Sequence, residues 1–147
     1  MLALCRKANG NLQGARQAFE TALGLSPRDP HLLGNFANHL SGTGQLDRAI
    51  ELYRRALELA PEHAQGWLNY GLALEAHGDP AAAAAALERA VALAPRSSSA
   101  WQALGAARRA SGEPEAARTA FLEAVRVDPG NGGAWTSLGV VHRLLGD

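Results

Sequence analysis

The sequence repeats itself every 34 residues, and this period constrains the fold more than any other feature. Proline recurs at Pro27, Pro61, Pro95 and Pro129, and glycine recurs at Gly10, Gly44, Gly78, Gly112 and Gly146. Four further rows keep the same register: Ala15, Ala49, Ala83 and Ala117; Phe19, Tyr53, Leu87 and Phe121; Ala22, Ala56, Ala90 and Ala124; and Leu33, Trp67, Trp101 and Trp135. Such a period is typical of a solenoid, in which each repeat buries its apolar face against its neighbours.

Each repeat carries the pattern of two helices. Between each proline and the next glycine, apolar residues recur at helical spacing, as at Trp67, Tyr70 and Leu74. A second helical stretch follows the glycine, as at Leu46 and Tyr53. The alternation of apolar and polar residues that marks a strand is missing, so the sequence predicts pairs of antiparallel helices throughout.

Glycine, proline and capping residues mark the ends of these helices. The glycine row can adopt the left-handed conformation that ends a first helix, and Pro80 and Pro114 suit the first turn of a second helix. Asp29, Ser97 and Asn131 stand just before first helices, where their side chains can accept hydrogen bonds from free backbone N–H groups. The proline row ends each second helix.

The rows of small and large residues predict how the helices pack. Close approach of two helices requires small side chains at the contact. The first helices supply Gly71, Gly105 and Gly139, which we expect to face Ala83 and Ala117 on the second helices. The tryptophan row is interpreted as a set of core anchors instead of a stacking platform for a ligand, because leucine takes the same place at Leu33.

The pattern Trp-x-x-Leu/Tyr-Gly, then alanine, phenylalanine or tyrosine, alanine and proline, resembles the tetratricopeptide repeat family. The resemblance covers complete repeats at 30–63, 64–97 and 98–131, and partial repeats at 1–29, which begins inside a first helix, and at 132–147. It implies an all-α fold, a right-handed α-solenoid of antiparallel helix hairpins with about four repeats in a single domain over 1–147. It also implies a protein-interaction scaffold whose first helices line a concave groove.

In the family, specificity lies at six groove-facing places of each first helix, the second, fifth, sixth, ninth, twelfth and thirteenth. Here these places are rich in side-chain amides, which donate and accept hydrogen bonds and therefore suit the backbone of an extended or helical peptide. Other groove places hold Gly34, Ser41, Leu68, Ser99, Ala103, Ala106, Ser137 and Val140. The candidate peptide-binding residues are His31, Asn35, Asn38, Gln65, Asn69, Leu72, Glu75, Gln102, Arg109, Thr136 and Arg143.

Of the six groove-facing places, position 12 of the repeat carries the most charged residues. It is held by Lys7, Ser41, Glu75, Arg109 and Arg143. The last two, together with Arg108, make the C-terminal half of the groove more basic. This favours an acidic or carboxylate-bearing segment there, although a solvated row of charges explains the pattern at least as well.

One kind of family member, the receptor for chaperone tails, clamps a C-terminal carboxylate with lysine, arginine and asparagine. Asn38 and Asn69 match the asparagines of that clamp. Gly34, Ser99 and Ala103 stand where the cations are needed, which removes the charge-assisted hydrogen bonds that hold the carboxylate. The sequence therefore argues against this specificity.

Charge and composition exclude several classes of function. Fourteen basic and fourteen acidic residues give a formal net charge of 0, so no general field draws the chain to nucleic acid or to an anionic membrane. The N-terminal residues are too short in apolar length for a signal peptide or a membrane span. The single cysteine, Cys5, excludes an internal disulfide. We therefore expect a cytoplasmic protein that binds neither nucleic acid nor membrane.

No pattern typical of a catalytic or metal site occurs in the sequence. The stretch Gly42-x-Gly44-x-x-Asp47 lacks the third glycine of a dinucleotide-binding loop and joins two helices, so it predicts an interhelical turn. The five histidines show no metal-ligand spacing: His31, His39, His63, His77 and His142. We expect a non-catalytic protein without a cofactor or metal.

Two functional interpretations stay open at the level of sequence. The first is an adaptor that holds a peptide or a protein surface in its groove. The alternative is an accessory domain of a larger enzyme, a glycosyltransferase, sulfotransferase or hydroxylase, whose catalytic part lies outside this chain. The ends of a solenoid normally need polar caps, so we also expect self-association through terminal helices that expose Leu138, Val141, Leu144 and Leu145.

Overall fold

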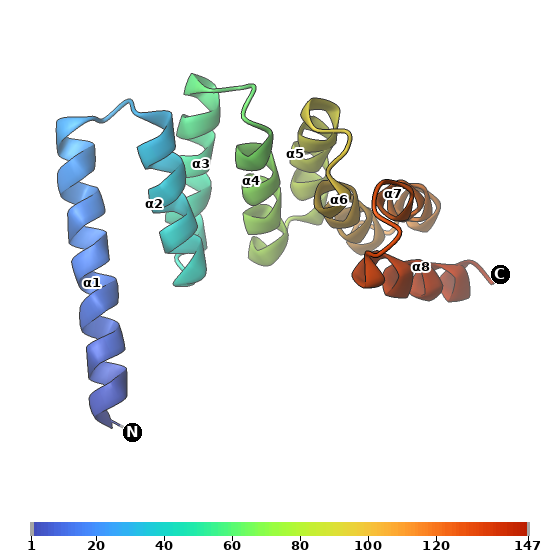
Figure 1. The fold of residues 1–147 in the computed structure, drawn as a ribbon, viewed down its shortest axis with the longest axis horizontal. Helices are drawn as coiled ribbons and strands as arrows, with labels where there is room; N and C mark the ends of the chain where they lie inside the picture. The colour runs from blue at the N-terminus through green and yellow to red at the C-terminus, as the bar shows by residue number, and fades with distance from the viewer. Residues whose placement is uncertain (1, 147) are drawn as a thin grey trace. The chain divides into compact units, whose positions relative to one another are not determined.

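The computed structural model describes the backbone of residues 2–146 and the side chains of residues 11–146, so the side chains of Cys5 and Lys7 lie outside the described part. Within that part the chain forms helices and turns, without strands (Figure 1). The helices are α1 (Leu2–Leu25), α2 (Pro30–Gly42), α3 (Leu46–Leu59), α4 (Ala64–His77), α5 (Pro80–Leu93), α6 (Ser98–Ala110), α7 (Pro114–Val127) and α8 (Gly132–Leu145). The predicted all-α helical repeat fold is confirmed.

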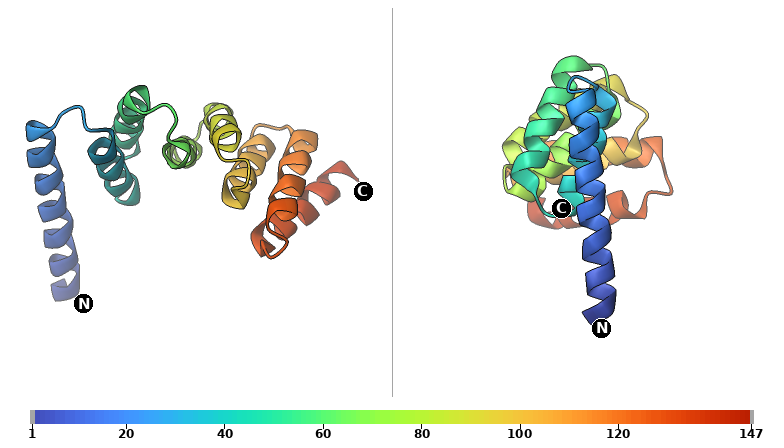
Figure 2. Two further views of the ribbon diagram at one scale, coloured as in Figure 1. Left: turned by 45° about the horizontal axis from the view of Figure 1, so that its top comes forward. Right: turned by 90° about the vertical axis from the view of Figure 1, so that its left-hand side faces the viewer.

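The helices divide into two compact units, Met1–Pro61 and Glu62–Asp147. In the first unit, α2 and α3 pack as an antiparallel pair and α1 contacts α2. In the second unit, the pairs α4/α5 and α6/α7 are followed by α8, and α4 also contacts α6, as α6 contacts α8 (Figure 2). The structure therefore contains complete helix hairpins at α2/α3, α4/α5 and α6/α7, at the places where the repeat register predicts them.

Except at Gly10, the predicted helix ends are confirmed. Gly44, Gly78, Gly112 and Gly146 have φ angles of +79°, +93°, +79° and +81°, which is the left-handed region that favours glycine. Asp29, Ser97 and Asn131 accept hydrogen bonds from the first N–H groups of α2, α6 and α8. Pro80 and Pro114 lie in the first turns of α5 and α7. Asp79 adds a cap to α5 that the sequence analysis did not assign.

The helix α1 differs from the sequence prediction. It runs without interruption over Leu2–Leu25, so Gly10 lies inside a helix where the repeat register predicts a turn. A glycine permits a left-handed turn but does not impose one. Residues 2–9 form only about two helical turns, which gives a folded-back helix little surface to bury. Continuing the helix through Gly10 costs about 1 kcal/mol relative to alanine.

Aromatic side chains join α1 to α2. The rings of Phe19 and Phe36 stack with centroids 5.1 Å apart, and the ring of His39 lies 5.6 Å from that of Phe19. An ion pair between Glu20 of α1 and Arg48 of α3, with 3.6 Å between the charged atoms, adds a contact at the surface. Phe36 is buried, so this stacked pair is an apolar contact between α1 and the α2/α3 hairpin.

The small rows produce close helix contacts, and the nearest atoms at two of the glycines belong to large residues of the second helices. A Cβ atom added to Gly71 would lie 2.5 Å from Cγ of Leu87, and one added to Gly105 would lie 2.7 Å from the ring of Phe121. These large side chains, and not Ala83 or Ala117, are the nearest atoms that a side chain at the two glycines would meet. The helices thus come together because glycine leaves room for a large residue opposite. At Gly139 no atom lies within 4 Å of such a Cβ.

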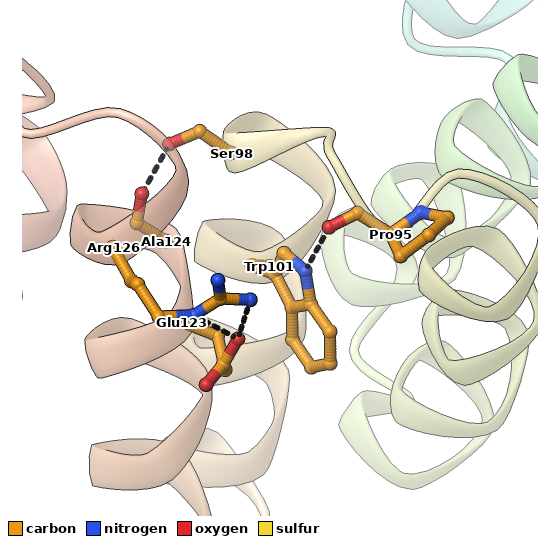
Figure 3. Close-up of polar contacts among 6 residues, drawn as sticks. All are labelled: Pro95, Ser98, Trp101, Glu123, Ala124 and Arg126. Atoms are coloured by element: carbon orange, nitrogen blue, oxygen red, sulfur yellow. Dashed lines mark hydrogen bonds and ion pairs between the residues drawn. The ribbon is translucent and has the colours of Figure 1, made fainter.

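The tryptophans are not buried core anchors, which corrects the sequence interpretation. Leu33 is fully buried, but Trp67 and Trp101 are half-buried and Trp135 is 51% exposed. The indole N–H of Trp101 donates to the carbonyl oxygen of Pro95 at 2.9 Å (Figure 3), and that of Trp135 donates to Pro129 at 3.0 Å. An indole N–H needs an acceptor, and the turn before the helix offers a free carbonyl, which draws the ring to the edge of the core.

Trp101 nevertheless adds to the packing between repeats. Its ring contacts the buried cluster of Ala124, Val125 and Ala134, which come from α7 and α8. Beside it, the hydroxyl of Ser98 donates to the carbonyl oxygen of Ala124 at 2.9 Å, as Figure 3 shows. Trp101 therefore holds the turn before α6 and covers the edge of the next helices.

Candidate functional site

A depression of about 320 Å³ lies between α4 and α6 in the second unit. The lining side chains come from both helices: Leu68, Leu72 and Glu75 from α4, and Ser99, Gln102, Ala103 and Ala106 from α6. The depression exists because leucines on α4 stand opposite small residues on α6. Its floor is apolar, and Leu72 is 44% exposed at its edge.

Amide groups lie at the N-terminal end of this depression. The side chain of Gln65 donates from Nε2 to Oδ1 of Asn69 at 2.9 Å, along one face of α4. Gln102 reaches toward the start of α8, since a Cβ added to Gly133 would lie 2.7 Å from its Nε2. The missing side chain at Gly133 thus leaves the space that the Gln102 amide occupies.

A charged pair lies at the C-terminal end of the depression. Burial raises the pKa of the Glu75 carboxyl, and the positive charge of Arg109 on α6 lowers it. Burial has the larger effect on this pKa. It acts by removing the water that would solvate the charged carboxylate. Arg109 itself is exposed, whereas its neighbour Arg108 donates to Glu88 of α5 at 2.7 Å and is engaged away from the depression.

The remaining candidate residues of the second unit lie on α8. Thr136 is exposed, and its hydroxyl donates to the carbonyl oxygen of Gly132 at 2.9 Å within the same helix. Arg143 is exposed in the last turn of α8. Leu138 and Val141 of the same helix are buried with Phe121, and Leu145 packs against them, which corrects the expectation that these apolar residues lack a partner. Leu144 is exposed, as expected. Since α6 contacts both α4 and α8, the three helices present one continuous face, which we call the α4–α6–α8 face.

The other candidate residues belong to the first unit. His31, Asn35 and Asn38 are exposed on α2. The hydroxyl of Tyr53, on α3, donates to Oδ1 of Asn38 at 2.5 Å, so this amide is bound to the hairpin core. The first unit also has depressions beside α1, which share Leu12 and His39 in their lining.

The structure therefore brings part of the predicted set together and adds apolar members to it. Leu72, Glu75 and Gln102 line the depression, with Gln65, Asn69 and Arg109 on the same two helices. The chosen set omitted the lining residues Leu68, Ser99, Ala103 and Ala106, although the repeat register places all of them in the groove. These residues share small size or apolar character, and the candidate set was chosen mainly for polar side chains.

The described part of the chain shows neither a metal-binding cluster nor a membrane-spanning helix. Among the residues that the structure describes, no group of three or more histidine, cysteine, aspartate or glutamate side chains could hold a metal ion. None of the described helices combines the length and apolar character that crossing a membrane requires.

Known proteins resemble this chain along most of its length. Tetratricopeptide repeat family models match residues 1–29, 35–98 and 98–141. No curated protein matches the chain.

Solved structures share the fold. The crystal structure of MamA has a TM-score of 0.89 and 26% identity, covering 96% of this chain and 82% of that one. The TPR domain of Sgt2 from Aspergillus fumigatus has a TM-score of 0.75 and 25% identity, covering 79% of this chain and 78% of that one. The first TPR of Spaghetti (RPAP3), bound to the HSP90 peptide SRMEEVD, has a TM-score of 0.78 and 24% identity, covering 81% of this chain and 94% of that one.

Proposed function

Since this chain belongs to the tetratricopeptide repeat family, we propose that it is a protein-interaction scaffold that holds a segment of a partner protein on its α4–α6–α8 face. The segment lies over the depression between α4 and α6, where it buries apolar side chains and meets amide groups at one end. Binding of this kind needs no catalytic group and no cofactor.

The depression between α4 and α6 is the observation that supports this proposal. It combines an apolar floor with convergent polar groups at its edges, which is the usual composition of a binding site. Leu72 is 44% exposed there, so covering it would release ordered water and favour association. Gln65 and Gln102 supply both donors and acceptors, which suit the N–H and C=O groups of a peptide backbone.

The comparisons support the same kind of function at the level of the fold. A domain with this fold, the first TPR of RPAP3, was solved with an HSP90 peptide bound. A helical repeat of this size can therefore hold a short peptide. The residues that select a partner differ from one member to another, so the specificity of this chain must be read from its own α4–α6–α8 face.

The experiment that tests the proposal fills the depression. Peptides that bind the wild-type chain are first selected from a random peptide library, and their affinities are then measured by fluorescence polarisation. Ala106→Phe places a ring in the depression and is expected to weaken binding roughly 30-fold, the loss typical of a hot-spot contact.

The matched control is Thr119→Phe, which adds the same ring at an exposed position of α7 away from the depression. Circular dichroism verifies that both variants keep their helices. Equal affinities of Ala106→Phe and Thr119→Phe for every selected peptide would place the binding surface elsewhere.

A further inference from the structure

Resting on the function proposed above, we propose that the bound segment carries an aliphatic side chain next to an acidic one. The aliphatic side chain enters the depression between α4 and α6. The carboxylate binds Arg109 and Arg143 at the C-terminal ends of α6 and α8. This names the chemistry of the partner, which the fold alone leaves open.

The floor of the depression selects an aliphatic group. Leu68 and Leu72 line the depression from α4, and Ala103 and Ala106 line it from α6, so most of its surface is hydrocarbon. The volume of about 320 Å³ is at the lower limit for ligand sites, which begin at roughly 300 Å³. One or two aliphatic side chains therefore fill it, and the alanines leave the room that larger residues on α6 would remove.

The charges on the same face favour an anion. Among the groove places of α4, α6 and α8, the ionisable residues are Glu75, Arg109 and Arg143, which leave an excess of one positive charge. The whole chain has a formal net charge of 0, so this excess is local to the face. A carboxylate on the partner complements it.

The positions of the three groups strengthen this choice. Glu75 is half-buried, and the positive charge of Arg109 already acts on its carboxylate. It therefore does not present an exposed anion to a cationic partner. Arg109 and Arg143 are exposed, and a guanidinium binds a carboxylate through two parallel N–H···O hydrogen bonds.

This arrangement differs from the clamp by which chaperone-tail receptors hold a C-terminal carboxylate, because the cations stand at other groove places. Ser99 and Ala103 lack the charge that such a clamp needs on α6, and Asn69 is hydrogen bonded to Gln65. The cations at the groove places of α6 and α8 lie instead one helical turn or more further along, in the last turns of these helices. The carboxylate is therefore expected on a side chain near the aliphatic anchor, and a free chain terminus is not required.

The test uses the full chain and a set of short fluorescein-labelled peptides with a glycine-serine background. Their centres carry Leu-Asp, Leu-Asn, Leu-Lys or Ser-Asp, and fluorescence polarisation gives the dissociation constant of each. The Leu-Asp peptide is expected to bind most tightly. Arg109→Gln and Arg143→Gln should each weaken it about two- to fivefold, the range for an exposed ion pair, and leave the Leu-Asn peptide unchanged.

Two further variants separate the contributions. Leu72→Ala should weaken both the Leu-Asp and the Leu-Asn peptides, because it removes part of the apolar wall. Arg96→Gln removes the same charge from an exposed turn outside the face and should change neither. Raising the salt concentration should weaken the Leu-Asp peptide more than the Leu-Asn peptide.

Three outcomes would overturn the inference: tighter binding of the Leu-Lys peptide, equal loss in Arg96→Gln and Arg109→Gln, or no binding by any of these peptides. The first outcome keeps the proposed scaffold function when Leu72→Ala still weakens the Leu-Lys peptide, since the face then binds a segment of other charge. The third leaves that function to be judged by the library selection and the Ala106→Phe variant.

Discussion

The hairpins α2/α3 and α6/α7 solve the same packing problem in two ways. In α6/α7, Gly105 leaves space for the ring of Phe121, and the contact contains no polar atom. In α2/α3 the same two rows hold Ala37 and Tyr53, so the first helix carries a methyl group and the large residue carries a hydroxyl. Both pairs are buried, so the repeat tolerates either combination.

The difference has an effect outside the core. The hydroxyl of Tyr53 needs a hydrogen-bond partner and donates to Asn38, a groove place of α2. On α6 the equivalent place is Ala106, which lines the depression and is free to contact a ligand. A polar core residue thus uses a side chain that would otherwise face a partner, so core and groove are not independent in this repeat.

The largest effect is expected when the large core residue of α6/α7 is removed. Phe121→Ala deletes a fully buried ring and leaves a cavity opposite Gly105. The free energy of unfolding is expected to fall by about 3–5 kcal/mol. Urea denaturation followed by circular dichroism measures the change. A loss below about 1 kcal/mol would show that α6 and α7 close over the gap, against the rigid packing described here.

A smaller effect, with opposite signs at two positions, comes from adding one methyl group. Gly105→Ala should destabilise by about 1–3 kcal/mol, because the new Cβ would lie 2.7 Å from the Phe121 ring. Gly139→Ala is in the same row of α8, where the space is open, and should stabilise by up to about 1 kcal/mol through helix propensity. The change in stability of both variants is measured by thermal unfolding. The same sign at both positions would refute the role assigned to Gly105.

The smallest effect is expected in α2/α3, where the large residue carries a hydroxyl. Tyr53→Phe removes the hydroxyl that binds Asn38 and should lower the free energy of unfolding by about 0.5–1.5 kcal/mol near neutral pH. Asn38 is exposed and can bind water instead, which places the loss at the lower end.

The same residue predicts a pH dependence. Burial raises the pKa of Tyr53 from 10.0 to about 12, so the folded state holds this proton more tightly than the unfolded chain. The resulting stabilisation is complete below pH 10 and is lost as the pH rises toward 12. Wild type should therefore lose its advantage over Tyr53→Phe across this range in urea denaturation. A constant difference between the two proteins would contradict the burial of the phenol.

Much of the fold follows from the repeat register. The rows of proline, glycine and capping residues predict the ends of α2 to α8, because these residues act through local backbone chemistry. Asp29 and Asn131 cap their helices as expected. The register does not predict α1, because whether Gly10 ends a helix depends on the surface that a folded-back helix would bury, which local sequence does not contain.

The site was harder to predict than the fold. A residue row indicates which face of a helix a side chain occupies, but not which side chain on the next helix it meets. For this reason the rows do not reveal that Leu87 and Phe121 lie nearest to Gly71 and Gly105, or that the charge of Arg109 on α6 acts on Glu75 of α4. The exposure of Trp135 likewise depends on a hydrogen bond to a turn that composition does not reveal.

The position of the three tryptophans has a practical consequence for following how this chain unfolds. The indoles of Trp101 and Trp135 are hydrogen bonded to the turns before their helices, and Trp67 and Trp101 are half-buried whereas Trp135 is exposed. Replacing two of them by phenylalanine leaves one intrinsic fluorophore per protein, whose emission reports on a single junction. The order in which Trp67, Trp101 and Trp135 shift to the red during unfolding would then map where the array begins to open.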